Sequence, residues 1–318
     1  MRAANGQDAE MAEKLTGKAE ALRELASRSI ADVEARMSKL EIRNSGEARV
    51  SAALFLTIAE QFQAALTLVD NRSSSHAAAP IRSMVESVVD LVNIAKNANY
   101  VNQLIFDNAR TDATSLTRYL DAMGDGAIGP SADRFREVLQ ITEETRDRLK
   151  AAGFKRQTRE DKFEMAGLVD LSASYGLFCM LVHPNITALT HRHAGNDNKF
   201  KYREPVHPET MSTLLSVAIR TLTEAVRHLP CFSNIDRAAA QTLLDDMRTA
   251  CLNTSRIPRR GVRAVPRLMT MRRSSLEVRD FTACHPKPRL DSDRGFLLFA
   301  YMIPKPSTST PSDRMPSN

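Results

Sequence analysis

An apolar helical segment reads His76-Ala-Ala-Ala-Pro-Ile-Arg-Ser-Met-Val-Glu86-Ser-Val-Val-Asp90, and a second one reads Tyr175-Gly-Leu-Phe-Cys-Met-Leu-Val-His183-Pro-Asn185. Both have the composition of helices that pack in a protein core, yet each carries polar side chains. A polar or charged group in such a helix must be paired or must serve a site, because burial without a partner is costly. The two segments therefore predict a helical core with a candidate site inside it.

The composition around these segments also favours helices. Gly is scarce at 12 of 318 residues, aromatic residues make up 5%, and Trp is absent. Such a bias suits helices better than a twisted sheet with Gly-rich turns. We expect an all-α, bundle-like domain of about seven to nine helices over residues 45–254. An apolar stripe with helical spacing predicts an N-terminal amphipathic arm over residues 1–44.

The last part of the chain differs from the rest. Eight of the 14 prolines lie after residue 255, and this part holds 13 Lys and Arg against 5 Asp and Glu, a net charge of +8. Residues 1–255 therefore carry a net charge of −2, so the pI near 9.2 says nothing about the partners of the helical domain. We expect residues 255–318 to form a poorly ordered tail that could bind nucleic acid without sequence preference.

The cysteines and the apolar runs indicate in which cellular compartment the protein is expected. The four cysteines lie far apart, without a C-x-x-C pair, and are expected to be reduced thiols: Cys179, Cys231, Cys251 and Cys284. The first residues lack the apolar stretch of a signal peptide, and no run approaches about 18 apolar residues. The sequence therefore predicts a cytoplasmic protein without a membrane span.

Turn signals divide the domain into helices. Gly124 to Pro130 is the clearest loop, and Ser131 predicts a capped start of the next helix. Residues 163–182 are expected to form one helix. Pro184 removes a backbone donor, so a kink or an end is expected beside His183.

The polar residues of the two segments could form one site. Arg82, Glu86 and Asp90 stand at i, i+4 and i+8, so they share a helix face. His183 follows the apolar run 177–182 and is expected to be a buried imidazole at a helix end. We expect Arg82 and Glu86 to approach His183 or Asn185.

Neither a metal nor a cofactor is expected. His191 and His193 lie about 200° apart on a helix, too divergent to join His183 on one ion. The usual phosphate-loop, dinucleotide, esterase and zinc-protease motifs are absent from the sequence.

Residues from about 60 to 194 resemble a bacterial family of helical proteins known as a domain of unknown function. The resemblance rests on Ala-x-x-x-Arg-Ser-x-x-Glu at 78–86, on Phe-Asp-Asn-Ala-Arg at 106–110, and on Tyr-x7-His-x-Asn-x3-Leu-x2-Arg-His at 175–193. It implies an all-α fold in which these polar residues converge, and it carries no established activity.

Two classes of function remain open. The first is a cytoplasmic binding or interaction module in which the polar cluster is structural or holds a small anion. Its candidate residues are Arg82, Glu86, His183, Asn185, Arg192 and His193. The second is a helical nuclease or other phosphodiester hydrolase, with phage defence as a setting in which such an enzyme could act. There His183 would be the general base, Glu86 would orient it, and Arg82 or Arg192 would stabilise phosphate charge. The partners stay unknown, although the N-terminal helix offers a face for a second copy.

Overall fold

The computed structural model describes residues 2–124, 129–183, 186–193, 201–202 and 206–255. The chain divides into two units, Met1–Arg260 and Gly261–Asn318, and everything described lies in the first. These described residues form eleven α-helices, one 3-10 turn and no strand beyond an isolated bridge between Ile42 and Ser233. The expected all-α fold is confirmed. The predicted tail lies outside the described residues.

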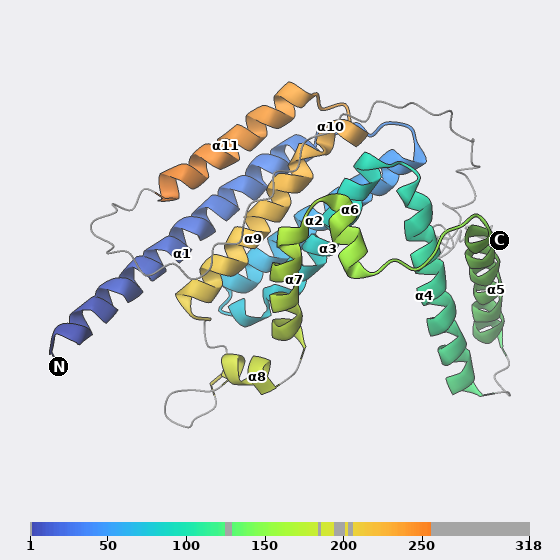
Figure 1. Ribbon diagram of the computed structural model, residues 1–318, viewed down its shortest axis with the longest axis horizontal. Coiled ribbons are helices and arrows are strands. Elements are labelled where there is room, and N and C mark those ends of the chain that lie inside the picture. Colours follow the sequence, from blue (N-terminus) through green and yellow to red (C-terminus); the bar gives the residue numbers. More distant parts are fainter. Residues whose placement is uncertain (1, 125–128, 184–185, 194–200, 203–205, 256–318) are drawn as a thin grey trace, which may run out of the picture. The chain divides into compact units, whose positions relative to one another are not determined.

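Figure 1 shows the order of the elements. Their bounds are α1 Arg2–Met37, α2 Gly46–Asp70, η1 Ser74–His76, α3 Ala78–Lys96, α4 Tyr100–Met123, α5 Pro130–Ala151, α6 Arg159–Ala166, α7 Val169–Val182, α8 Ile186–His193, α9 Pro208–Arg227, α10 Leu229–Phe232 and α11 Arg237–Ser255.

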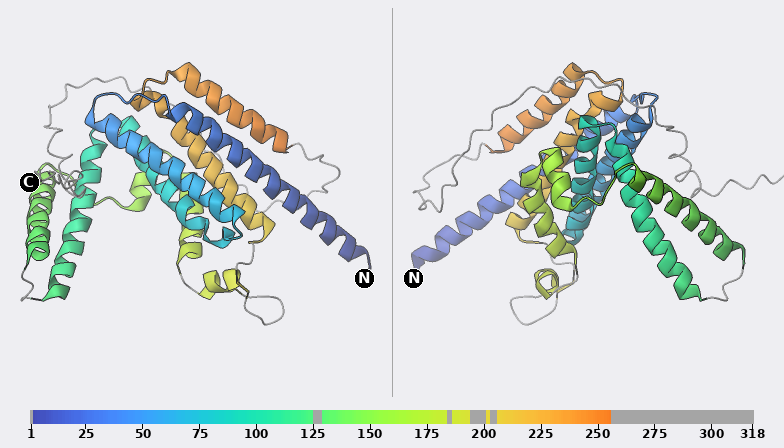
Figure 2. Two further views of the ribbon diagram at one scale, coloured as in Figure 1. Left: turned by 180° about the vertical axis from the view of Figure 1, so that it is seen from behind. Right: turned by 45° about the vertical axis from the view of Figure 1, so that its right-hand side comes forward.

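The core lies between α2, α3 and α9. Helix α2 pairs with α3, both contact α9, and α1 packs against α9 and α11. Figures 1 and 2 show α11, α1 and α9 running side by side. Phe55, Ile58, Met84, Leu91 and Leu222 are fully buried there. Each such side chain contributes roughly 1.5–3 kcal/mol of hydrophobic stabilisation, so this core fixes the position of α3.

Helix α2 is long and apolar enough to cross a membrane by length and composition. The expectation that no segment reaches that length is therefore wrong for α2. Its residues Phe55, Ile58 and Phe62 are completely buried in the helical core, against α3, α9 and α10. A long apolar helix in the core of a protein also meets this criterion of length and composition. The burial of these side chains is what a core helix requires.

Helices α4 and α5 form a hairpin whose closest packing is between the two helices themselves. Tyr119 and Phe135 stack edge to face across it, with ring centroids 4.8 Å apart. The expected loop between them is bounded by Gly124 and Gly129, both with positive φ, while residues 125–128 are not described. Helix α5 begins at Pro130 rather than at Ser131, because proline suits the first position of a helix.

The helix expected over 163–182 is two helices. Gly167 adopts the left-handed conformation with φ 70° and ends α6, and α7 begins two residues later. The break beside Pro184 is confirmed, since α7 ends at Val182. Counting α6, the short α8 and the four-residue α10, α2 to α11 make ten helices, so the expected seven to nine was too few.

Candidate functional site

The polar face of α3 lies where α3 meets α6 and α7. Its apolar residues are buried, among them Met84, Val85 and Val88. Arg82, Glu86 and Asp90 follow one another along the remaining face, as the spacing predicts. Arg82 Nη2 lies 3.3 Å from Glu86 Oε1, so the first two form an ion pair.

Tyr175 of α7 closes this pair into a three-way cluster. Arg82 Nε donates to the Tyr175 hydroxyl at 3.0 Å, and that hydroxyl donates to the Glu86 carboxylate. Burial and the bond to Glu86 raise the pKa of Tyr175, so the phenol stays neutral. Arg82, Glu86 and Tyr175 thus hold one another in a fixed arrangement, which we call the Tyr175 cluster.

Helix α6 brings a second arginine to Tyr175. Arg159 Cζ lies 4.2 Å from the centroid of the Tyr175 ring, and Arg82 Cζ lies 5.3 Å from it. Phe163 packs edge to face on the same ring at 5.9 Å. Both contacts to arginine are within the distance of a cation–π interaction.

The local sequence explains why Arg159 stands at this place. Thr158 and Asp161 form a capping box, in which each side chain accepts from the other's backbone N–H, so α6 begins at Arg159. At the other end Lys96 Nζ donates to the carbonyls of Met165 and Ala166 at 2.9 and 2.8 Å. The capping box thus fixes the start of this short helix locally, and Lys96 fixes its end against α3.

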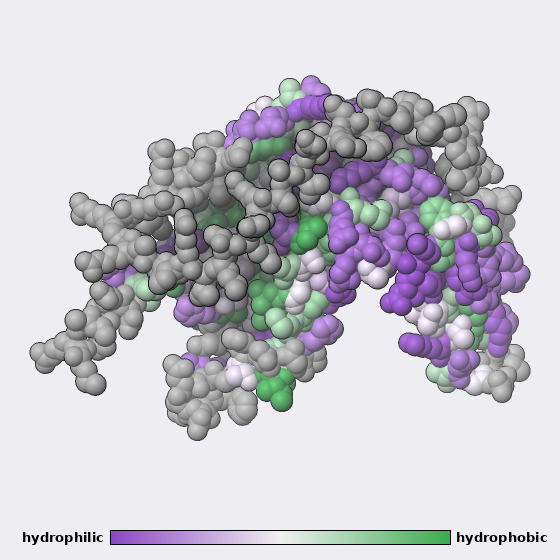
Figure 3. Space-filling view, in the orientation of Figure 1, coloured by the Kyte–Doolittle hydropathy of each residue, from purple (hydrophilic) through white to green (hydrophobic). Residues whose placement is uncertain are grey.

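One side of the Tyr175 cluster is open to solvent. Tyr175 is 1% exposed, but the side chains of Arg82 and Glu86 are 25% and 48% exposed, and Arg159 is exposed as well. The charged groups can therefore meet a ligand while the phenol that aligns them stays in the core. Figure 3 shows apolar surface over the neighbouring α7 and α8, where Leu177, Met180, Ile186 and Leu189 are exposed.

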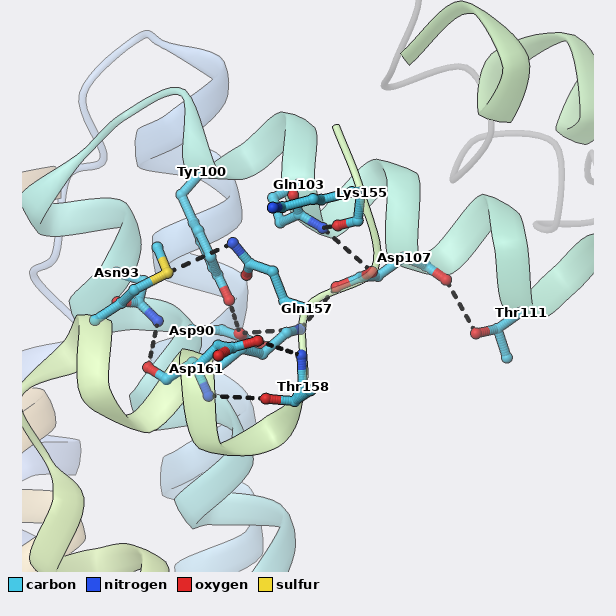
Figure 4. Close-up of polar contacts among 12 residues, drawn as sticks. Asp90, Asn93, Tyr100, Gln103, Asp107, Thr111, Lys155, Gln157, Thr158 and Asp161 are labelled. Atoms are coloured by element: carbon cyan, nitrogen blue, oxygen red, sulfur yellow. Dashed lines mark hydrogen bonds and ion pairs between the residues drawn. The ribbon is translucent and has the colours of Figure 1, made fainter. Parts of the chain in front are cut away.

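A second polar network continues along α3 towards α4. Lys162 Nζ lies 2.9 Å from Asp107 Oδ2 and 3.8 Å from Asp90 Oδ1. The Tyr100 hydroxyl donates to Asp90 at 2.8 Å, and Gln103 donates to Asp107 at 3.3 Å and to the Lys155 carbonyl at 2.9 Å. Figure 4 shows Asp90, Tyr100, Gln103 and Asp107 converging from α3 and α4 on the start of α6. We call these residues the Lys162 network.

The Lys162 network is much more enclosed than the Tyr175 cluster. Its ionised side chains are 21% exposed at Lys162, 22% at Asp90 and 15% at Asp107. Burial raises the pKa of Asp90, and the charge of Lys162 and the bond from Tyr100 oppose that rise only in part. The arrangement is that of a structural network that joins three helices.

The structure does not bring His183 to Arg82 and Glu86. His183 caps the end of α7 and is exposed, so the expectation of a buried imidazole is wrong. Among the described residues no hydrogen bond or ion pair joins it to either side chain. It stands eight residues beyond Tyr175, about 12 Å along a helix, where α7 has already left the core. Asn185 lies outside the described residues.

Arg192 and His193 belong to a different polar group. Arg192 donates to the carbonyl of Leu181, and His193 Nδ1 lies 3.2 Å from the carbonyl of Lys201. The six candidate residues of the sequence are therefore separated: Arg82 and Glu86 lie in the Tyr175 cluster, His183 ends α7, Arg192 and His193 lie on α8, and Asn185 is outside the described residues.

The sequence analysis did not single out Tyr175, Arg159 or Lys162, although signals for these residues exist. Tyr175 stands in the 175–193 motif without a role. Arg159 lies inside the capping Thr158-x-x-Asp161 and Lys162 directly after it, at i and i+3 on one helix face. Tyr100 and Gln103 of the Lys162 network carry no such signal. Within the described residues no three His, Cys, Asp or Glu side chains converge as metal ligands would. A separate groove of about 560 Å³ between α1, α9 and α11 contains none of the cluster residues.

Replacing Glu86 by Gln is expected to lower the free energy of unfolding by less than about 1 kcal/mol, because water already screens this half-exposed ion pair. The amide oxygen can still accept from Tyr175. A denaturant midpoint measured on both proteins checks this. A loss above about 2 kcal/mol would show that the carboxylate is desolvated, as in a buried ion pair.

The fold and its cluster define an all-α domain with a partly open Arg-Glu-Tyr site at the junction of three helices. Residues 48–201 match the model of a family described as a family of unknown function (DUF5677). This match confirms the resemblance to such a family that the sequence indicated for residues 60 to 194. No curated protein and no solved structure matches the chain.

Proposed function

We propose that the protein is a binding module for a ligand with a carboxylate or phosphate group, held by Arg159 and Arg82 beside Tyr175. The observation that carries this proposal is the position and the pairing of the Arg159 guanidinium. Its guanidinium lies over the Tyr175 ring, is exposed, and among the described residues pairs with no carboxylate. A guanidinium whose face rests on an aromatic ring keeps its N–H edge for a planar anionic partner.

Arg82 supports the same reading. Two of its donors are used by Tyr175 and Glu86, which fix the direction of the side chain. Burial opposes the positive charge, but these two bonds outweigh it and raise the pKa of Arg82. A guanidinium has five N–H donors, so donors remain for a ligand after both bonds are made.

The charge balance of the cluster also favours an anion. Among the described residues, Glu86 is the carboxylate that pairs with an arginine of the cluster, so the guanidiniums of Arg82 and Arg159 exceed the paired carboxylate by one positive charge. Other exposed arginines are neutralised directly, for example Arg23 by Asp70 at 2.6 Å. An anionic ligand would supply the missing counter-charge with preorganised, charge-assisted hydrogen bonds.

The hydrolase alternative has no contact in its favour among the described residues. It requires Glu86 to orient His183 as a general base, whereas Glu86 accepts from Arg82 and Tyr175. General base catalysis needs hydrogen-bond reach between the partners. The binding module is therefore the function that we propose.

The proposal is tested by titrating the full-length protein with acetate and with inorganic phosphate while following the arginine Nε–Hε signals by NMR. We expect saturable shifts of the Arg82 and Arg159 signals with one or both probes. Arg159→Ala should weaken the response of Arg82 by at least about tenfold in Kd, which is about 1.4 kcal/mol for a charge-assisted pair.

The matched control is Arg156→Ala. Arg156 is also exposed and stands three residues earlier, before the capping box of α6, so the titration should be unchanged. The proposal fails if neither probe shifts the Arg159 signal saturably, or if Arg156→Ala weakens binding as much as Arg159→Ala.

A further inference from the structure

Helix α7 presents an apolar face to solvent. Leu171 and Phe178 are completely buried on one side of the helix, whereas Val169, Leu177 and Met180 are exposed on the other. A surface helix of a globular protein normally carries polar residues on its outer side. Because the outer side of α7 is apolar instead, it has the composition of a contact surface.

Helix α8 extends this apolar surface beyond the end of α7. Arg192 donates to the carbonyl of Leu181, and Ala188 is buried, so α8 is fixed to the end of α7. Ile186, which is 83% exposed, and Leu189 face solvent. Figure 3 shows apolar surface over both helices in one view. We call the exposed apolar side chains of the two helices the α7–α8 face: Val169, Leu177, Met180, Ile186 and Leu189.

Basic and aromatic residues stand at the end of α8. Lys201 N donates to the His193 carbonyl at 2.7 Å, and His193 Nδ1 lies 3.2 Å from the Lys201 carbonyl. These two bonds bring the exposed Lys201 and Tyr202 to the end of α8, where Arg192 also lies. Residues 171–193 include no Asp or Glu, so this part of the sequence contributes only basic charge.

The shape of the α7–α8 face favours an extended partner. A small apolar ligand needs a concave pocket that covers most of its surface. In the described part of the chain, the groove of about 560 Å³ lies between α1, α9 and α11 and includes no residue of the α7–α8 face. Side chains that project from helices can instead enter a soft apolar medium such as the boundary of a lipid bilayer.

We propose that the α7–α8 face binds the surface of an anionic lipid bilayer. Leu177, Met180 and Ile186 enter the boundary between headgroups and acyl chains. Arg192 and Lys201 then meet lipid phosphates, as basic residues beside an interfacial helix do. A neighbouring exposed tyrosine suits the headgroup level, where amphipathic rings are enriched.

The helices lie on the membrane and do not span it. Helix α7 has 14 residues, about 21 Å, whereas the hydrocarbon core of a bilayer is roughly 30 Å thick. The membrane site goes beyond the proposed function, because it shares no residue with the Tyr175 cluster. Loss of one activity would therefore leave the other intact.

A second copy of the chain is a poorer occupant of this face. In a two-fold dimer the same patch contacts itself, so the partner brings the same basic groups and, from residues 171–193, no carboxylate to pair with them. Asp170, just before this stretch, already pairs with Arg220 of α9. An anionic bilayer supplies negative charge and an apolar layer together.

The absence of Trp from the sequence provides the test. Met180→Trp places a single indole on the α7–α8 face, at a position that is 55% exposed. The full-length variant is titrated with vesicles of phosphatidylcholine and phosphatidylglycerol at about 3:1 while its emission is recorded. We expect a shift to shorter wavelength and at least about twofold quenching by brominated acyl chains, because the indole leaves water. Binding to phosphatidylcholine alone should be at least about fivefold weaker.

Two matched controls place the contact on this face. Tyr119→Trp, at the 51% exposed position of the α4–α5 hairpin, should be neither shifted nor quenched. Leu177→Ser, added to Met180→Trp, should weaken vesicle binding at least about fivefold, because an exposed leucine no longer enters the boundary. Leu56→Ser, at an exposed leucine of α2, should leave binding unchanged. Ile186→Trp is a second reporter on α8.

The inference is overturned if anionic vesicles neither shift nor quench the indole in folded Met180→Trp and Ile186→Trp proteins. Attachment of vesicles through the basic residues 256–318 alone would give that result. Equal quenching of Tyr119→Trp, or equal weakening by Leu56→Ser and Leu177→Ser, would also overturn it. A shift that depends on protein concentration without lipid would assign the face to a second copy instead.

Discussion

Replacing Lys162 by Met is expected to lower the free energy of unfolding by about 3 kcal/mol at pH 7, the largest effect of a charge-removing substitution in the described clusters. Lys162 is the cation that faces both Asp90 and Asp107, and all three side chains are largely enclosed. Without it two carboxylates would share one poorly hydrated space. A urea unfolding curve at pH 7 measures the loss.

Lys155→Ala is the matched control. Lys155 is exposed, and only its backbone carbonyl enters the Lys162 network, so its side chain should be dispensable. Adding Asp107→Asn to Lys162→Met should recover part of the loss, because one of the two uncompensated charges is gone. A Lys162→Met protein as stable as the parent would mean that water reaches the network freely.

The Lys162→Met loss should shrink as pH falls. Burial holds the pKa of Asp90 above its ordinary value of 3.8, so the folded protein binds a proton at Asp90 more readily than the unfolded chain does. The ionised form is therefore destabilising, and stability contributed by Asp90 falls as pH rises through its folded pKa. Removing Lys162 raises that pKa further. The difference between the two proteins should be smaller near pH 4.5 than at pH 7, and a loss independent of pH would contradict this account.

Replacing Tyr175 by Ala is expected to cost about 4 kcal/mol, because it empties the space of an aromatic ring in a close-packed core. The ring is 1% exposed, packs on Phe163, and lies against both Arg82 and Arg159. Tyr175→Phe should cost only about 1 kcal/mol, since it removes the hydroxyl and leaves partly solvated partners. Thermal and urea unfolding of the two variants separate the ring from the hydroxyl.

Tyr119 supplies the matched aromatic control. It also stacks edge to face on a phenylalanine, but it is 51% exposed on the α4–α5 hairpin. Tyr119→Ala should therefore cost about 1 kcal/mol, close to the value of the aromatic pair alone. Equal losses for Tyr119→Ala and Tyr175→Ala would show that burial at α7 does not decide the effect.

The arrangement along single helices followed from sequence spacing. Arg82, Glu86 and Asp90 share one face because a helix places residues four apart above one another, and their apolar neighbours are buried as expected. The end of α7 beside Pro184 was predicted for a similar local reason. The break at Gly167 was not predicted, since apolar residues continue across it. A single glycine in a sequence does not indicate whether it adopts the left-handed conformation.

The sequence did not predict which side chains on different helices contact each other. Arg82 and Glu86 face Tyr175 rather than His183, because α7 crosses α3 near Tyr175 and leaves the core before His183.

The sequence by itself determined the all-α class, the apolar faces and the polar residues available for a site, because helical periodicity is a property of neighbouring residues. Tertiary structure alone decided which polar residues meet and which of them reach solvent. These depend on where the helices cross, and crossing is set by the packing of whole apolar faces rather than by local spacing.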